Sequence, residues 1–338
     1  MRAGSVIAIG EALIDRLGPL GGDPSVDHPV IDCFGGAPAN VACALSRLGA
    51  NVSFIGSIGN DVYGHDFKNL MIKRGINTIG LQQDNSRPTR VVLVRRDLNG
   101  ERSFEGFKGD KGFGFADQAI SREKIIRDWS KIVNDAKWLI IGTIPLASEI
   151  SSQAFLWCIK NALDAGISIA LDMNWRPTFW RKTFSKVLEP SSREKEEINS
   201  ILTNVSLIKL AKEEANWFFN SSDPIYISSI LPQRPSVVVT DGANPVSWLL
   251  NKFSGNSFAI KPSSIVDTTG AGDAFTAGLI YKLLSFDLDQ LTEKNAHEII
   301  QYAMACGAFV CQGIGAIDSQ PYCEDVDELL FLSDGGVS

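Results

Sequence analysis

The sequence predicts an α/β fold, built on a mainly parallel sheet with helices on both of its faces. Residues 5–10 form a short apolar run that ends at a glycine, which is typical of a central strand. From about residue 137 onward, strand-like stretches at 138–142 and 167–171 alternate with a helix-like stretch at 149–163. Such alternation is the pattern of parallel strands joined by covering helices. A chain of 338 residues suffices for one large domain of this kind or for two ordinary ones.

The composition restricts the classes of function. Apolar residues make up 44% and charged residues 21% of the chain, as in a folded globular protein. A net charge of -7 argues against nucleic acid or an anionic membrane as the main partner. Six cysteines without a C-x-x-C pair and only three histidines leave little from which to build a disulfide scaffold, a zinc site or a histidine-based triad. We see no targeting pattern and no membrane-length apolar stretch, so we expect a cytoplasmic protein.

The chain is organised around residues 266–275, where an extended run enters a glycine-containing turn and then a helical pattern. Gly270 and Gly272 allow the backbone to lie close to a ligand, because they carry no Cβ. The free amides at the start of the following helix, with its positive dipole end, form a cradle for a phosphate or an oxyanion. Asp273 lies in the same turn, where a carboxylate could act as a general base. The plain structural alternative is a helix N-terminus capped by an aspartate.

The pattern D-T-T-G-A-G-D-x-F, unbroken over residues 267–275, resembles the C-terminal signature of the ribokinase-like (PfkB-type) sugar kinases. The resemblance implies that Gly270, Ala271 and Gly272 form the anion hole for the transferred phosphoryl group. It also implies that Asp273 takes the proton from the attacking sugar hydroxyl.

The same resemblance implies that the whole chain, 1–338, is one ribokinase-like domain. This domain is a three-layer α/β/α sandwich with a mainly parallel central sheet and a small β-strand lid. We expect the lid to be formed by residues of about 11–34 and 86–110, the second of which contains two strand-like runs around a hairpin signal at 97–100. In the family such a lid closes over the sugar and often pairs with another subunit, so a homodimer through the lid is implied.

Sugar contacts are implied near the N-terminus. The motif G-G-A-P-A-N at 35–40 precedes a helical pattern and looks like the family's N-terminal signature, in which Gly35, Gly36 and Asn40 contact the sugar. Upstream, the motif G-E-x-L-I-D ends at Asp15. In the fructokinase-like branch this acid binds sugar hydroxyls, since a carboxylate can accept hydrogen bonds from two hydroxyls at once. The alternatives are ordinary helix-start punctuation and a strand-end acid.

Further substrate contacts are expected from the lid strands and from the end of a central strand. Arg90 and Phe104 could project onto the substrate, with lid packing as the alternative. Asp172, Asn174 and Arg176 follow a strand at the edge where open α/β sheets bind ligands. They resemble the D-x-N-x-R of fructokinases and of 2-keto-3-deoxygluconate kinases. This implies that Asp172 and Asn174 organise the site and that Arg176 approaches phosphate or substrate, the alternative being a surface arginine.

Two family motifs on the nucleotide side are incomplete. Glu214 occupies the place of the glutamate in N-x-x-E, which orders Mg²⁺ and its waters, but Ala211 replaces the asparagine. The implied metal role therefore rests on Glu214 alone. The nucleotide loop T-x-G-x-x-G is matched at Thr240 and Gly242, whereas Pro245 replaces its last glycine and has no amide to donate.

Small residues mark a second part of the expected nucleotide site. Ala303 and Gly307 lie in a helical pattern and would leave room for a flat adenine, with close helix packing as the alternative. Asp267 and the loop near Gly315 resemble the monovalent-cation site of some relatives. The implied cofactors are therefore ATP and Mg²⁺, with K⁺ as an option at Asp267.

Our leading hypothesis is an ATP-dependent sugar kinase that converts fructose into fructose 6-phosphate at a primary hydroxyl. Neither a Walker A motif nor a full Rossmann fingerprint occurs, so the charge clamp must come from a helix N-terminus, Mg²⁺ and side chains. The alternatives are a ribokinase, a nucleoside kinase and a 2-keto-3-deoxygluconate kinase, whose substrate carboxylate could bind Arg90, Arg102 or Arg176. A catalytically silent interaction protein on this fold would be expected to lose the base or the glycines, which are present. An NAD-linked oxidoreductase lacks its fingerprint.

Overall fold

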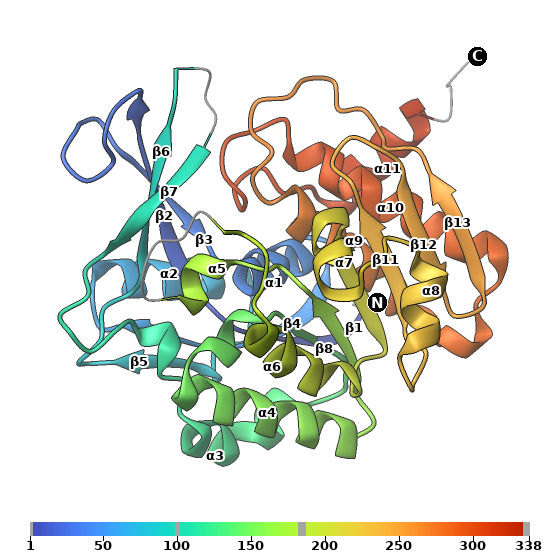
Figure 1. The fold of residues 1–338 in the computed structure, drawn as a ribbon, viewed down its shortest axis with the longest axis horizontal. Coiled ribbons are helices and arrows are strands. Elements are labelled where there is room, and N and C mark those ends of the chain that lie inside the picture. The colour runs from blue at the N-terminus through green and yellow to red at the C-terminus, as the bar shows by residue number, and fades with distance from the viewer. Residues whose placement is uncertain (1–2, 99–101, 182–186, 334–338) are drawn as a thin grey trace.

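The computed structural model describes residues 3–98, 102–181 and 187–333. Among these residues a nine-stranded sheet has the order β13-β12-β11-β10-β9-β8-β1-β4-β5 (Figure 1). Its strands are β1 (Ala3–Ile9), β4 (Ala50–Gly59), β5 (Leu81–Asp84), β8 (Ala136–Ile141), β9 (Ser168–Asp172), β10 (Leu207–Ala211), β11 (Ser236–Thr240), β12 (Val246–Leu250) and β13 (Phe253–Ser257). Turn positions 99 and 100 and the Arg102 side chain fall outside the described part.

The sheet is mainly parallel, as the sequence predicts. Every neighbouring pair from β11 to β5 is parallel, and only β12 and β13, at one edge, are antiparallel to their neighbours. In the centre, Val6 of β1 lies between Val52 of β4 and Trp138 of β8. Strands of this kind are buried on both faces and therefore read as continuous apolar runs rather than as alternating ones.

Helices cover both faces of the sheet, because successive side chains of a strand point to opposite faces. Val6 and Ala8 of β1 belong to a hydrophobic cluster shared with α1, α9 and α10. Ile7 and Ile9 belong to a second cluster, shared with α3, α4 and α6. The expected three-layer α/β/α arrangement is therefore confirmed. The described helices are α1 (Ala37–Arg47), α2 (Val62–Lys73), α3 (Arg122–Ile132), α4 (Glu149–Asp164), α5 (Pro177–Trp180), α6 (Ser192–Leu202), α7 (Lys212–Phe219), α8 (Pro224–Ile230), α9 (Ala271–Leu283), α10 (Glu293–Val310) and α11 (Cys323–Ser333), with short 3₁₀ turns η1 (Ala116–Gln118), η2 (Ile144–Ala147) and η3 (Leu288–Gln290).

Two helices begin in an unusual way. Most of the others follow a side-chain cap, such as Asp61, whose carboxylate accepts the Gly64 amide at 2.8 Å at the start of α2. In contrast, α1 and α9 begin after glycines with positive φ, Gly36 at 100° and Gly270 at 81°, and neither glycine has a side chain to cap the helix. Instead of a cap from the preceding residue, the Ala37 amide of α1 donates to Oε1 of Glu11 at 3.1 Å, and the Ala271 amide of α9 donates to the Thr268 carbonyl at 3.2 Å.

A smaller, lid-like sheet lies beside the layers, at the upper left of Figure 1. Its strand order is β3-β2-β6-β7, with β2 parallel to β6 and the other pairs antiparallel. The four strands are β2 (Leu13–Leu20), β3 (Ile31–Gly35), β6 (Val91–Arg96) and β7 (Arg102–Lys108). They lie in the two segments expected to form the lid, except that β3 ends at Gly35, one residue beyond the expected limit.

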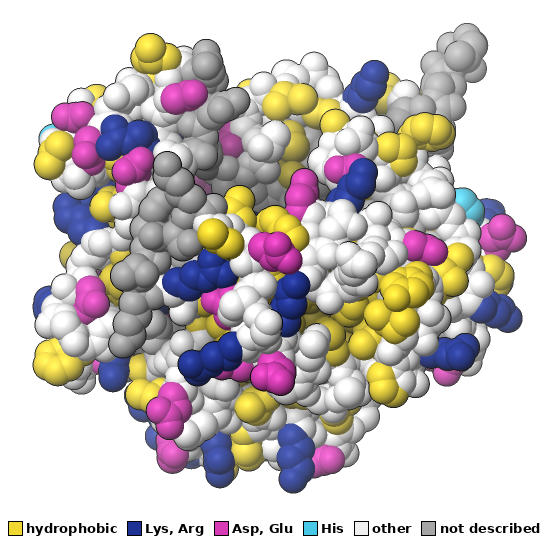
Figure 2. All heavy atoms as spheres, in the orientation of Figure 1, with side chains coloured by type: hydrophobic (Ala, Val, Ile, Leu, Met, Phe, Trp, Pro, Cys, Tyr) yellow, Lys and Arg dark blue, Asp and Glu magenta, His cyan; other side chains and the backbone are white. Residues whose placement is uncertain are grey.

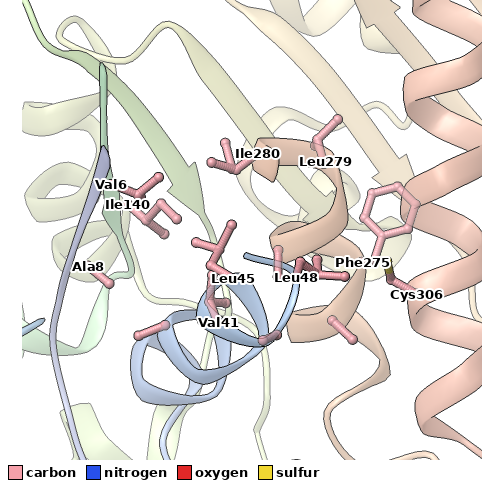
Figure 3. Close-up of a cluster of buried hydrophobic side chains, with 14 of the residues drawn as sticks. Val6, Ala8, Val41, Leu45, Leu48, Ile140, Phe275, Leu279, Ile280 and Cys306 are labelled. Carbon is pink, nitrogen blue, oxygen red and sulfur yellow. The ribbon is translucent and has the colours of Figure 1, made fainter. Parts of the chain in front are cut away.

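The packing of α1 against α9 determines where the site forms. Figure 3 shows Leu45 of α1, and Leu48 just after this helix, gathered with Leu279 and Ile280 of α9 in one apolar cluster. All four side chains are at most 2% exposed. Because this contact fixes the two helices against each other, their N-terminal turns also come together.

The outer surface has mixed charge. On the face drawn in Figure 2, Lys and Arg side chains lie interspersed with Asp and Glu side chains. Across the described ranges of the chain, we find no helix that combines the length and the apolar character needed to cross a membrane.

Candidate active site

The start of α9 has the close backbone packing that its glycines permit. A Cβ on Gly270 would lie 2.5 Å from the Cβ of Ala316, so a larger residue would push this turn away from the 313–320 loop. A Cβ on Gly272 would lie 3.0 Å from Nζ of Lys209. The predicted anion-hole residues Gly270, Ala271 and Gly272 therefore lie in one turn, with a lysine ammonium against it.

Asp273 follows this turn and is held by α1. Its Oδ2 accepts a hydrogen bond of 2.8 Å from Nδ2 of Asn40, a residue 233 positions away in the chain. Burial, and then the nearby negative charge of Asp172, raise the pKa of Asp273 to about 6, against the opposing effects of Asn40, Lys209 and Arg176. A carboxylate with this pKa is mostly ionised at neutral pH and can still accept a proton.

Lys209, on β10, was not among the residues predicted from the sequence. Its Nζ lies 3.2 Å from both carboxylate oxygens of Asp172, and both side chains are almost buried. Burial lowers the pKa of Lys209, but Asp172, Glu214 and Asp273 together outweigh it, so that the net change is upward. The ammonium therefore stays charged. The signal available in the sequence was a lysine in the otherwise apolar strand L-I-K-L.

Asp172 connects β9 and β10 with α9. Besides Lys209, it accepts a hydrogen bond of 2.7 Å from Oγ1 of Thr276, one turn into α9. Thr276, which sequence reasoning also missed, lies 3.0 Å from the carbonyl oxygen of Gly272. Asp172 thus holds the ammonium on one side and the anion-hole helix on the other, as a residue that organises the site would.

Glu214 supports the loop that carries Arg176. Its Oε1 accepts the Trp175 amide and its Oε2 accepts the Ala211 amide, each at 2.7 Å. Arg176 is exposed, with Nη1 donating to the Trp175 carbonyl at 2.9 Å, and Asn174 takes a left-handed φ of 38°. The structure therefore gives Glu214 a role in loop anchoring, which the missing asparagine at Ala211 does not affect.

The described residues contain no group of three or more His, Cys, Asp or Glu side chains that could hold a metal ion. Mg²⁺ usually keeps several waters and takes only one or two protein carboxylates, so it needs no such group when it arrives on nucleotide phosphates. The role of Glu214 in ordering Mg²⁺ stays a prediction.

The predicted sugar-binding residues near the N-terminus lie together. A Cβ on Gly35 would lie 2.4 Å from Oδ2 of Asp15, across the β2–β3 ladder. A Cβ on Gly36 would lie 2.5 Å from the carbonyl oxygen of Glu11. Asn40, one turn into α1, then brings this group to Asp273. The buried carboxyl of Glu11, also missed from the sequence, accepts the Ala37 amide at 3.1 Å.

Arg90 lies in a buried enclosure, which is the second of the two settings expected for it. Its guanidinium forms a bidentate pair with Asp117 (2.9 and 3.0 Å), and both side chains are 3% exposed. The rings of Phe107, Phe115 and Phe179 lie 4.4–4.8 Å from the guanidinium carbon. The charge of Arg90 is therefore already paired in an aromatic enclosure, in keeping with lid packing. Phe104 lies on β7 with its ring 5.0 Å from that of Phe107.

The expected nucleotide-binding residues are distributed between two loops and one helix. Gly242 is exposed with a φ of 56°, and Thr240 ends β11 with Oγ1 donating to the Leu210 carbonyl at 3.3 Å. A Cβ on Gly307 of α10 would lie 3.0 Å from the Ala271 carbonyl, so this glycine underlies the anion hole. Ala303 is 0% exposed, and its small side chain serves the packing of α10 on α9 rather than an open surface.

Asp267 links the anion-hole turn to the loop at Gly315 by hydrogen bonds. Its Oδ1 accepts the amide and the hydroxyl of Thr269, at 3.0 and 2.7 Å. Its Oδ2 accepts the Gly315 amide at 3.0 Å. The resemblance to a monovalent-cation site at Asp267 and Gly315 stays a prediction.

Comparisons with known proteins extend over the whole chain. A family model described as pfkB family carbohydrate kinase matches residues 3–323. A probable fructokinase-6, chloroplastic, from Arabidopsis thaliana is 32% identical over 334 residues, which cover 96% of this chain and 82% of that protein.

Solved structures are similar as well. A fructokinase from Xylella fastidiosa with bound ATP has a TM-score of 0.81 and 28% identity, covering 98% of this chain and 99% of its own. A fructokinase from Vibrio cholerae O395 with fructose, ADP and calcium ion has a TM-score of 0.79 and 25% identity, covering 97% and 99%. With a ribokinase-like fold, an acid and an anion-hole turn at one point, and a family match along almost its entire length, this chain belongs to the pfkB family of carbohydrate kinases.

Proposed function

We propose that this chain transfers the γ-phosphoryl group of ATP to a primary hydroxyl of fructose, giving fructose 6-phosphate. The observation that supports the proposal most directly is the 2.8 Å hydrogen bond from Asn40 to Asp273, beside the uncapped start of α9. A carboxylate and the glycine-containing start of a helix thus lie at one point. They meet the two requirements of this reaction, which are to remove a proton from an alcohol and to stabilise a phosphoryl group in transfer.

Asp273 is the proposed general base. Asn40 donates to Oδ2, so we expect Oδ1 to face the attacking hydroxyl. With a pKa of about 6, Asp273 is mostly ionised before the reaction and remains basic enough to accept the proton as the new P–O bond forms.

The proposed charge clamp combines backbone amides with two cations. The proposed clamp uses the amides of Gly270 and Gly272, because the Ala271 amide donates to the Thr268 carbonyl at 3.2 Å. The charged Lys209 lies against Gly272. Arg176, which is exposed on its loop, adds a second positive charge. Mg²⁺ bound with ATP would neutralise further phosphate charge, with Glu214 receiving one of its waters. Catalysis by positioning and charge stabilisation is sufficient for phosphoryl transfer.

The proposed substrate contacts follow the same geometry. Asp15, Gly35, Gly36 and Asn40 lie together on the lid side, and we assign them to the sugar. We assign Asp172 and Asn174 to the organisation of the active site. On the ATP side we retain Thr240, Gly242 and Gly307. We also propose that residues 1–338 form one domain, in which the smaller sheet closes over the sugar.

The pairing of Arg90 with Asp117 favours fructose over a keto acid as the substrate. A sugar acid such as 2-keto-3-deoxygluconate needs cations for its carboxylate, and the guanidinium of Arg90 is already paired with Asp117. Two of the solved relatives are fructokinases, one with fructose and ADP bound. K⁺ dependence, a homodimer through the lid and a cytoplasmic location stay predictions.

A panel of acceptors tests the substrate. The purified chain, with ATP and Mg²⁺, is assayed with fructose, 2-keto-3-deoxygluconate, ribose and a nucleoside. We expect the highest kcat/KM with fructose. No turnover of fructose, together with turnover of another acceptor, would overturn the choice of sugar.

Asp273→Asn tests the chemistry. This variant should lower kcat by at least about 100-fold, because the amide cannot accept the proton, while stabilisation of the fold by ATP is retained. The matched control is Asp66→Asn on the exposed face of α2, which should keep the wild-type rate. Near-normal turnover by Asp273→Asn would remove the proposed mechanism.

A further inference from the structure

Gln320 is a buried amide between two parts of the active site. It lies between α10 and α11, and its side chain is 1% exposed. Its Nε2 donates two hydrogen bonds of 2.9 Å, one to the carbonyl oxygen of Asn40 and one to that of Ala316. Two carbonyl partners fix the orientation of the amide, because the flipped group would direct its own oxygen at both of them.

The two partners belong to different functional groups of the site. Asn40 is the residue whose side chain holds Asp273, at 2.8 Å. Ala316 packs on the anion hole, since its Cβ and Cα lie 2.5 and 2.7 Å from where a Cβ on Gly270 would be. One amide thus bonds to the backbone that presents the acid's partner and to the backbone that supports the phosphoryl cradle.

The loop that carries Gln320 is itself firmly held. Arg47, at the end of α1, donates to the Asp318 carbonyl at 2.9 Å, and Arg74, which follows α2, donates to the Ile317 carbonyl at 3.0 Å. The Gly315 amide bonds to Asp267 at 3.0 Å. Because these bonds anchor the loop on several sides, Gln320 can serve as a fixed point for the start of α1.

We propose that Gln320 is a positioning residue for the phosphoryl transfer, which fixes the start of α1, and so Asn40 and Asp273, relative to the anion hole at Gly270. The inference rests on the proposed function, since it assumes that Asp273 is the base. It predicts that loss of the two hydrogen bonds impairs catalysis through Asn40 rather than through overall stability.

The pH profile provides a readout that a merely structural role would not change. The hydrogen bond from Asn40 lowers the pKa of Asp273, so a misplaced Asn40 should raise it and move the acidic limb of kcat/KM to higher pH. The other charged and titratable groups that act on Asp273 come from four further segments: Glu11, Asp172, Arg176 and Lys209.

The experiment replaces Gln320 by methionine, which keeps the length of the side chain and removes both donors. We expect Gln320→Met to lower kcat about 10-fold and to shift the acidic limb upward, because small displacements of a reacting group are costly. In the double variant with Asn40→Ala, Gln320→Met should cause no further shift, since its effect is transmitted through Asn40.

Gln82→Met is the matched control. Gln82 is 8% exposed, and its amide bonds to the backbone of Ser121 at 2.9 and 2.8 Å, away from every residue of the candidate site. It should lower the melting temperature but leave kcat and the acidic limb unchanged. If Gln320→Met fails to fold, Gln320→Leu removes the same donors with an apolar side chain.

The outcomes separate the inference from the proposed function. Wild-type kcat and an unshifted limb in Gln320→Met, or fully additive effects with Asn40→Ala, would overturn the positioning role. Activity of Asp273→Asn close to wild type would instead overturn the proposed function, whatever Gln320→Met does.

Discussion

Two buried pairs of a cation with an aspartate support different parts of this molecule. Arg90 and Asp117 lie beneath the smaller sheet, with two bonds of 2.9 and 3.0 Å and 3% exposure on each side chain. Lys209 and Asp172 lie beneath the anion hole, with two longer distances of 3.2 Å and exposures of 10% and 6%.

The difference between the pairs lies in what else each cation contacts. Three phenyl rings enclose the guanidinium of Arg90, whereas the ammonium of Lys209 lies against Gly272 and close to Asp273. A buried ion pair by itself is weak evidence for stability, because the attraction barely repays the desolvation of the two charges. These neighbours distinguish the two pairs: they support a structural role for Arg90 and the proposed role of Lys209 in charge stabilisation.

The largest effect on stability is expected at the enclosed pair. Arg90→Met should destabilise the fold by about 3–5 kcal/mol in urea unfolding, since it leaves Asp117 buried and unpaired. Arg95→Met, the same change on β6, the strand that follows Arg90, is the control. Arg95 pairs with Asp23 and Glu105 at the surface, so we expect a loss of less than about 1 kcal/mol. Equal losses of unfolding free energy in Arg90→Met and Arg95→Met would contradict the special contribution of the enclosed pair.

The next effect is expected on the rate. Lys209→Met should lower kcat about 100-fold, because it removes a charge beside the anion hole, while Asp172 keeps its bond to Thr276 and the fold is retained. Its loss should also raise the pKa of Asp273, so that the acidic limb of kcat/KM moves to higher pH. Lys160→Met, on the exposed face of α4, serves as the control. A wild-type rate in Lys209→Met would contradict the proposed role of Lys209 in the reaction and would leave no functional difference between the two pairs.

The smallest effect concerns Glu11, a buried acid near Asp117 and Asp273. Burial, and then the charges of Asp117 and Asp273, raise its pKa from 4.5 to about 8. The folded state therefore holds a proton that the unfolded chain releases, and this stability, present below pH 4.5, is lost as the pH rises through about 8.

Glu11→Gln removes this titration and keeps an acceptor for the Ala37 amide. Relative to wild type, the variant should gain on the order of 2 kcal/mol of unfolding free energy between pH 6 and pH 8. Urea unfolding at the two pH values measures it, with Glu196→Gln on the exposed face of α6 as the control. Parallel pH dependence of wild type and Glu11→Gln would show that Glu11 is ionised in the fold.

The fold and the catalytic turn were predictable because their signals are local. Apolar runs and helical periodicity gave the parallel sheet, and the glycines at 270 and 272 and the acid at 273 share one short motif. The pairing of Arg90 with Asp117 was not predictable, since nothing in a strand pattern says which of its charged residues is already neutralised from 27 positions away.

The sequence by itself determined the layered sheet, the family and the turn that contains Asp273, because backbone preference and close packing of glycine are written in neighbouring residues. Only the tertiary structure decided that Lys209 lies at the anion hole, that Glu11 lies buried near two aspartates, and that Gln320 bonds to Asn40 from 280 positions away. Desolvation and charge pairing depend on which atoms surround a group in space, and those atoms come from distant parts of the chain.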